Sequence, residues 1–321
     1  MKRIQGLLAC AGLILLSACS TVSDAQKLST VGVEASARAK ASSSAVYDAF
    51  VEGPRLDSLI QAYSTNGEQP ITHMPPATFN KIKDALEARV ELATSLADFY
   101  VSFGKLAGSD EQTNVDTSLS GVFDGASSFG VAMGKGALPP YVGSIAGEVG
   151  GLLASAVQRG EVLKANDELI VALNYYHEAL IDPNAREAII SLTDDAIGYR
   201  FKLLSLLWKQ GMLSGDPSIS GVIAASGVPF KLAARPEDLT VKSRAFNAVV
   251  QDELAQAQSD QLAAVADDYD STVKLVEELL KQHKALKSET KVDMAGVAAL
   301  AKRLKTIADL LKKDTPSKTG S

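Results

Sequence analysis

The chain has 321 residues, with 32 basic and 38 acidic side chains and a formal net charge of −6. A net negative charge disfavours general nucleic-acid binding, which depends on a basic surface, so no nucleic-acid partner is expected. Aromatic residues make up only 6% of the chain, whereas helix-forming residues are abundant, and this composition predicts an all-α protein.

The first nineteen residues have the pattern of a secretory leader. Two basic residues precede an almost wholly apolar segment, 6–16, which is too short to span a membrane as a helix. The four residues that close this leader resemble the lipobox of bacterial lipoproteins: Leu16, Ser17, Ala18 and Cys19.

This resemblance implies that residues 1–18 are a signal peptide and that Cys19 is acylated, so that its acyl chains hold the mature protein to a membrane. Ser20 follows the cysteine, where the inner-membrane retention signal of this class is Asp. In a diderm bacterium, the resemblance therefore implies the periplasmic face of the outer membrane. Cys10 would leave with the leader and Cys19 would carry lipid, so the resemblance also implies a mature chain without disulfides, thiolate metal sites or cysteine nucleophiles.

Helical patterns and loops alternate after the cysteine. Residues 19–45 are rich in Ala and Ser and poor in large apolar side chains, which predicts a lipidated tether that becomes a weak helix. A helical stripe follows and is predicted to be interrupted or kinked at Gly53 and Pro54. Between residues 79 and 100, apolar residues recur at alternating spacings of three and four, the pattern of a bundle or coiled-coil seam.

Residues 119–160 hold ten of the 24 glycines of the chain, and four pairs of these glycines are four residues apart. Glycines at that spacing share one helix face and let another backbone approach closely. Pro139 and Pro140 would turn the chain between two segments of small residues. The pattern predicts an inner helical hairpin, with three glycines as candidate close-packing or interface residues: Gly143, Gly147 and Gly151.

Two further helices are predicted at 160–181 and 184–213, followed by an apolar loop at 214–235. The longest helix would open at Pro236 and carry a seam of alternating three- and four-residue spacings over 262–286.

A last helix is predicted at 292–312, and residues 314–321 are expected to be a disordered tail. Together, these patterns predict an elongated antiparallel helical bundle over residues 46–313 with coiled-coil-like seams.

The charges near the C-terminus are segregated along the chain. Ten acids and three bases lie in 237–278, whereas ten bases and four acids lie in 281–318. Helix dipoles and neighbouring helices account for such a pattern. A second interpretation is contact with an anionic surface, either phospholipid or cell-wall polymer, through five side chains: Lys281, Lys284, Lys302, Arg303 and Lys305.

No motif of catalysis, metal binding or cofactor binding stands out. The three histidines are far apart in sequence, and His283, which falls on the predicted seam, is expected to be a core residue. The adjacent pairs Asp194-Asp195 and Asp267-Asp268 would point in different directions on a helix and are interpreted as solvated faces. We therefore expect no enzymatic activity, no metal and no cofactor.

The favoured interpretation is a structural or interaction lipoprotein of the cell envelope with an envelope protein as partner. One alternative is a membrane-active protein that uses the hairpin 119–160, a layout similar to that of α-helical pore-forming toxins. The other is an enzyme or small-ligand receptor whose site is not readable from the sequence, which a pocket with converging carboxylates would favour.

Overall fold

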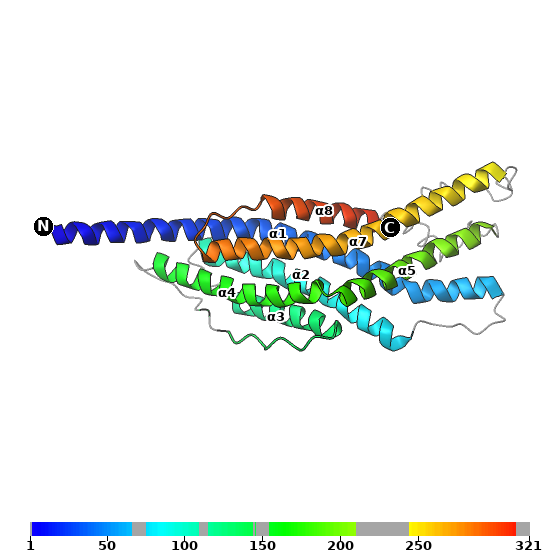
Figure 1. Ribbon diagram of the computed structural model, residues 1–321, viewed down its shortest axis with the longest axis horizontal. Coiled ribbons are helices and arrows are strands. Elements are labelled where there is room, and N and C mark those ends of the chain that lie inside the picture. Colours follow the sequence, from blue (N-terminus) through cyan, green and yellow to red (C-terminus); the bar gives the residue numbers. More distant parts are fainter. Residues whose placement is uncertain are drawn as a thin grey trace, which may run out of the picture. The chain divides into compact units, whose positions relative to one another are not determined.

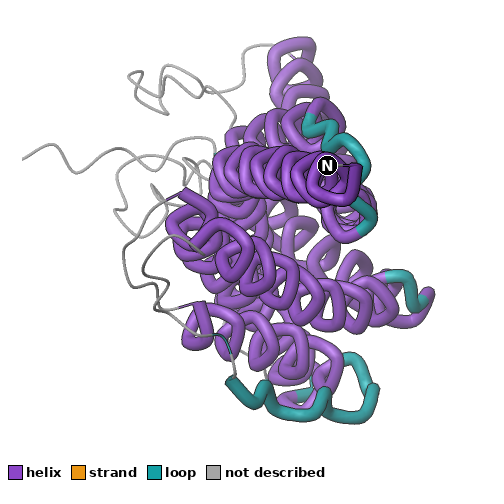
Figure 2. The backbone as a smooth tube through the Cα atoms, turned by 90° about the vertical axis from the view of Figure 1, so that its left-hand side faces the viewer, coloured by secondary structure: helices purple, strands orange, loops and turns teal. Residues whose placement is uncertain are grey.

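The computed structural model describes residues 2–65, 75–108, 115–143, 145, 154–209 and 244–312. Within these ranges all regular secondary structure is helical, and the all-α bundle fold that the composition predicts is confirmed (Figures 1 and 2). The helices, in chain order, are α1 (Lys2–Thr65), α2 (Pro76–Gly108), α3 (Val115–Ala132), α4 (Ala154–Leu180), α5 (Pro183–Lys209), α7 (Arg244–Lys287) and α8 (Ala295–Leu311). None of these helices is long and apolar enough to cross a membrane.

The helices contribute to two compact units. Unit 1 comprises residues 1–41, 87–182 and 271–304, and unit 2 comprises residues 42–86, 183–270 and 305–321. Helices α3 and α4 belong to unit 1 and α5 belongs to unit 2, whereas α1, α2, α7 and α8 each supply residues to both units.

The predicted seam of α7 is confirmed. Of its eight positions, only Leu262 is half-buried, and the others are buried: Val265, Tyr269, Thr272, Val276, Leu279, His283 and Leu286. The alternation of three and four residues keeps these side chains on one stripe of the helix. Helix α8 has the same regularity, with its buried stripe formed by Val297, Ala301, Leu304, Ala308 and Leu311.

The seam predicted for α2 accounts for only part of the surface that this helix buries. Ile82, Leu86, Ala93 and Tyr100 are buried, but Phe79, Val90 and Ala97 are half-exposed. The helix buries a second row as well, which includes Leu92, Leu96, Phe99 and Phe103. A helix with neighbours on several sides needs a broader apolar face than a two-helix seam provides.

The helix predicted within residues 19–45 is present and takes in the whole segment, so no non-helical tether precedes it. Helix α1 runs without a break from Lys2 to Thr65, and within unit 1 its side chains Ala25, Leu28 and Ala35 are fully buried. Small residues allow this packing, because a Cβ at Gly32 would lie 2.5 Å from the ring of Tyr100 on α2.

Of the interruption or kink predicted at Gly53 and Pro54, the interruption is absent, because Pro54 lies inside α1. In unit 2, a Cβ at Gly53 would lie 2.7 Å from the Cβ of Ala196 on α5. Gly53 therefore lets α1 and α5 approach each other closely and does not break α1.

The Gly-rich hairpin is confirmed in part. Helices α3 and α4 pack against each other in unit 1, with the rings of Phe129 and Tyr176 5.1 Å apart between centroids. However, residues 133–143 between them are not helical, so Gly143 does not share a helix face with other glycines. Gly134 adopts a φ of 91°, a left-handed conformation that ends α3.

Several predicted features lie outside the described residues. These are Gly147, Gly151, the apolar loop 214–235, the helix start at Pro236 and the tail 314–321. Helix α8 begins at Ala295, three residues after the predicted start at residue 292.

Candidate functional site

In unit 1, two glycines of α3 do provide the close approach that their spacing predicts. A Cβ at Gly125 would lie 2.9 Å from the Cα of Leu92, and one at Gly121 would lie 2.8 Å from the Oγ of Ser95, both on α2. Gly121 and Gly125 therefore let the backbones of α2 and α3 approach within a distance that side chains would prevent.

After α3 the chain returns along that helix as a non-helical strap, of which residues 135–143 and 145 are described. The strap is held by Asp116, which accepts hydrogen bonds from the hydroxyl of Tyr141 at 2.6 Å and from the backbone N–H of Ile145 at 3.3 Å. Midway, the backbone N–H of Leu138 donates to the Oγ of Ser127 at 3.1 Å. The strap presents Val142 to solvent, with 82% of that side chain exposed.

The core of unit 1 contains a buried polar network centred on His283. Its Nε2 accepts a hydrogen bond from the hydroxyl of Tyr100 at 2.8 Å, and its Nδ1 donates to the Oδ1 of Asn166 at 2.6 Å. The amide of Asn166 also donates to the backbone carbonyl of His283 at 3.0 Å. Burial lowers the pKa of His283 to about 3, so the ring is neutral near pH 7. The network joins α2, α4 and α7 and has no access to solvent, which gives it a structural role.

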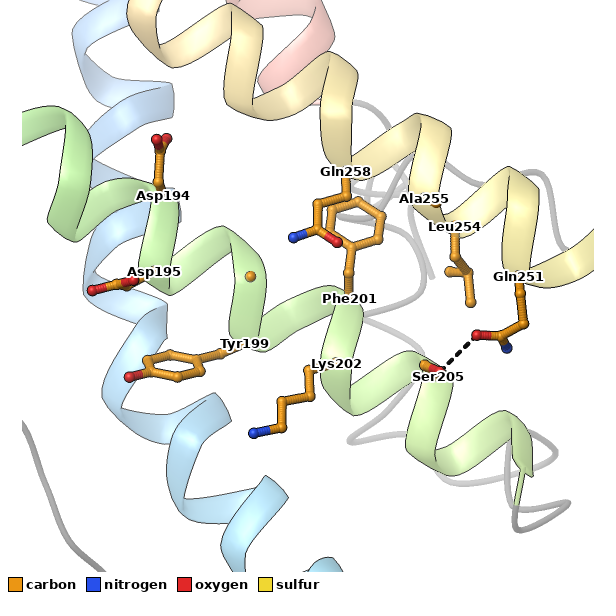
Figure 3. Close-up of a pocket in the computed structure, with 11 residues that line it drawn as sticks. Asp194, Asp195, Tyr199, Phe201, Lys202, Ser205, Gln251, Leu254, Ala255 and Gln258 are labelled. Atoms are coloured by element: carbon orange, nitrogen blue, oxygen red, sulfur yellow. Dashed lines mark hydrogen bonds between the residues drawn. The ribbon is translucent and has the colours of Figure 1, made fainter.

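Unit 2 contains a groove between α5 and α7, with a volume of about 530 Å³ (Figure 3). Its lining mixes carboxylates, amides, hydroxyls, one ammonium and apolar side chains: Asp194, Asp195, Gly198, Tyr199, Phe201, Lys202, Ser205, Gln251, Leu254, Ala255 and Gln258. A volume in this range is typical of small-ligand sites, and the groove is the candidate functional site.

Arg200 positions α5 within unit 2. Its guanidinium, of which 4% is exposed, donates to the Oε1 of Gln261 on α7 at 3.0 Å and to the Oε2 of Glu52 on α1 at 3.0 Å.

Two polar atoms of the groove are buried without a hydrogen-bond partner among the described residues. They are the Oδ1 of Asp194 and the Nε2 of Gln251. The other end of the Gln251 amide, its Oε1, accepts a hydrogen bond from the Oγ of Ser205 at 2.8 Å, which connects α7 to α5. Buried polar atoms are usually satisfied in folded proteins, and these two have almost no surface that solvent or a ligand could reach.

The electrostatics of the groove are set by its carboxylates. Burial, and then the neighbouring charge of Asp195, raise the pKa of Asp194 to about 6. Burial also raises the pKa of Tyr199, and the charges of Asp57 and Asp195 add to that effect. Burial disfavours a charge of either sign, whereas the negative charge of Asp195 favours a cation over an anion at the Asp194 end of the groove.

The sequence prediction for Asp194 and Asp195 is right for one residue and wrong for the other. The two carboxylates point to different sides of α5, as predicted, and Asp195 is exposed (Figure 3). Asp194, however, is half-buried. The partial burial of Asp194 could have been predicted from the sequence. Asp194 lies three residues before the buried Ile197 and therefore beside the apolar stripe of α5.

The predicted lipidation and cleavage residues, 16–19, belong to the first part of α1, and their side chains lie outside the described residues. The structure describes the side chains of α1 from Ser20 onward. Ser20 is exposed, and Thr21 is buried.

The five basic residues predicted to meet an anionic surface do not form one cluster. Lys281, which pairs with Glu278 at 3.1 Å, and Lys284 lie near the C-terminal end of α7. Helix α8 runs back from there, because a Cβ at Gly296 would lie 3.0 Å from the Glu278 side chain. Lys302 is therefore about 9 Å farther along α8 at 1.5 Å per residue, and Arg303 and Lys305 lie beyond it. Contact with an anionic surface stays a prediction.

Among the residues that the structure describes, no three His, Cys, Asp or Glu side chains gather as metal ligands would. Comparison with known protein families, with curated proteins and with solved structures finds no match to this chain.

Proposed function

We propose that this protein is a lipid-anchored helical module of the bacterial cell envelope that acts by binding another envelope protein. The observation that carries this proposal is the short distance between the lipobox cysteine and the folded chain. Thr21, two residues after Cys19, is buried, and Ala25 and Leu28 continue the buried stripe of α1. Acyl chains on Cys19 would therefore hold unit 1 directly at the membrane surface, without a flexible spacer.

Unit 1 also has a surface suited to a protein partner. The strap is fixed by the hydrogen bonds to Asp116 and Ser127, and it exposes Val142. A rigid segment with an exposed apolar side chain loses little conformational entropy on binding, which favours a protein contact.

The membrane-active alternative would require α3 to leave this packing. Its buried apolar side chains include Leu119, Val122 and Phe129, and Gly125 lies against the backbone of α2. Release of α3 would expose this whole face, a cost that favours the interaction module over the membrane-active protein.

The anchor is tested by metabolic labelling in a diderm bacterium with an alkyne fatty acid, followed by membrane fractionation. The wild-type chain should carry the label and fractionate with the outer membrane, and the Cys19→Ser variant should carry none. The Ser20→Asp variant should keep the label and move to the inner membrane. Absence of label on the wild-type chain would refute the anchor.

The partner is tested with a photo-activated crosslinker at Val142 in intact cells. We expect an adduct to another polypeptide, with the same crosslinker at Val171 on α4 as a comparison position of 49% exposure. Adducts to lipid at Val142 would support the membrane-active alternative instead.

A further inference from the structure

The strap of unit 1 follows α3 in an extended conformation (Figure 1). Leu138 lies beside Ser127, to whose Oγ its backbone N–H donates. Gly143 lies beside Asp116, because a Cβ at Gly143 would be 3.0 Å from the Oδ2 of that carboxylate. The five steps from Leu138 to Gly143 therefore cover the same length as the eleven steps from Asp116 to Ser127, about 16.5 Å at 1.5 Å per helical residue. The strap advances by about 3.3 Å per residue, the rise of an extended chain.

Burial along the strap repeats every three residues. Lys135, Leu138 and Tyr141 are half-buried, and the two residues after each of them are exposed. Tyr141 packs on Phe123 of α3, with 5.3 Å between the ring centroids. A β-strand would alternate with a period of two, whereas a polyproline II helix has three residues per turn. The strap is therefore a polyproline II helix with one inward edge and two outward edges, which are formed by Gly136, Ala137, Pro139, Pro140, Val142 and Gly143.

The sequence itself imposes this conformation. A proline ring fixes φ near −65°, and a residue that precedes a proline is disfavoured in the α region. Leu138 and Pro139 each precede a proline. Among the described residues, no backbone–backbone hydrogen bond involves 136–143, in agreement with the absence of internal hydrogen bonds in this type of helix. The hydroxyl of Tyr175 on α4 donates to the carbonyl of Gly136 and holds the start of the segment.

The two prolines restrict how a protein partner binds here. Pro139 and Pro140 have no N–H, so a strand of the partner would find no backbone donor at two consecutive positions, which disfavours strand addition. The outward edges carry neither a charge nor a hydrogen-bonding side chain, and present proline rings, Val142 and backbone carbonyls. Grooves lined with aromatic side chains bind this surface in proline-rich peptides, where the preformed helix keeps the entropy cost of binding low.

We propose that the strap is a polyproline II docking element and that the envelope partner binds it in a groove lined with aromatic side chains. This inference rests on the proposed binding of an envelope protein through the strap, and it names the kind of site that the partner carries. The attachment of α3 and α4 holds the inward edge, so the partner reads only the two outward edges of the helix.

The test compares the yield of the polypeptide adduct at Val142 in intact cells between the wild type and the double variant Pro139→Ala/Pro140→Ala. We expect the double variant to lose about tenfold of the adduct, an effect typical of residues that anchor an interface. Pro183→Ala is the matched control, because it removes an exposed proline at the start of α5, outside the strap, and should keep the full yield. Mass spectrometry of the wild-type adduct should place the crosslink beside Trp, Tyr or Phe of the partner.

A second measurement does not depend on how the double variant folds. A synthetic peptide of residues 136–143, added at millimolar concentration to isolated envelopes, should suppress the adduct of the wild-type chain, and the same peptide with both prolines replaced by alanine should not. An adduct that persists in the double variant and responds equally to both peptides would overturn the docking element and leave the interaction module intact. Absence of any polypeptide adduct at Val142 would overturn partner binding through the strap and this inference with it.

Discussion

The hydroxyl of Tyr100 on α2 donates a hydrogen bond to the Nε2 of His283 on α7 at 2.8 Å, and both side chains are fully buried in unit 1. The imidazole is thereby held as the neutral tautomer that carries its proton on Nδ1, where Asn166 accepts it. A buried neutral histidine makes the stability of the fold depend on pH.

Acid should destabilise unit 1 through His283. Its pKa is about 3 in the folded chain, below the ordinary value of 6.5, so the unfolded chain binds a proton that the folded chain does not. This contribution to stability is fully present above pH 6.5 and is lost as the pH falls, at about 1.4 kcal/mol per pH unit. Between pH 6 and pH 5, the slopes of unfolding free energy against pH for the wild type and the His283→Phe variant should differ by this amount, because both proteins keep every other titrating group. Equal slopes in the two proteins would assign the acid sensitivity to other groups.

Removal of the Tyr100 hydroxyl should destabilise the protein. The Tyr100→Phe variant leaves the Nε2 of His283 buried and unsatisfied, which costs about 1–3 kcal/mol. The free energy of unfolding in urea at pH 7.5 measures this loss. Tyr47→Phe on α1 removes a hydroxyl outside the network and should change stability by less than about 0.5 kcal/mol. Equal losses in both variants would contradict the role of the network.

The sequence predicts α7 well because large apolar residues at spacings of three and four define a buried stripe on their own. The seam from Val265 to Leu286 depends on nothing beyond the helix itself. The burial of His283 follows from its place on that stripe, but its partners Tyr100 and Asn166 do not, because they lie on helices far away in sequence.

Helix α1 shows why other parts could not be predicted. Its segment 20–45 is poor in large apolar residues, and the surface it buries is supplied by its partner, since the ring of Tyr100 lies over Gly32. The groove of unit 2 could not be predicted from the sequence for the same reason. Asp194 and Gln251 are 57 positions apart, and only the packing of α5 on α7 places them in one channel.

The close approach at Gly125 should make that position intolerant of any side chain. Gly125→Ala gains up to about 1 kcal/mol of helix propensity, but its Cβ would lie 2.9 Å from the Cα of Leu92, a backbone atom that cannot move aside. Overpacking of this kind costs about 1–3 kcal/mol, so we expect net destabilisation. Gly160→Ala on α4 is the matched control, because nothing lies within 4 Å of its added Cβ, and it should stabilise the protein. A stable Gly125→Ala variant would show that α2 and α3 are not in close contact.

At neutral pH, Asp194 should make unit 2 less stable than an uncharged asparagine at the same position would. Its folded-state pKa of about 6 lies above the ordinary value of 3.8, so the folded chain holds a proton that the unfolded chain releases between these values. The stability gained from that proton is present at low pH and lost as the pH rises through 6. Above pH 7 the folded chain carries a half-buried, ionised carboxylate without a hydrogen bond to its Oδ1 among the described residues.

The Asp194→Asn variant removes that charge and should raise the free energy of unfolding at pH 7.5 by about 1 kcal/mol, an amount reduced by solvent screening. The gain should shrink as the pH is lowered from 7.5 to 5, because the wild-type carboxyl becomes protonated over that range. Asp195→Asn, at an exposed position, should give a smaller gain. A gain that is independent of pH would mean that Asp194 titrates normally and that burial does not set its charge.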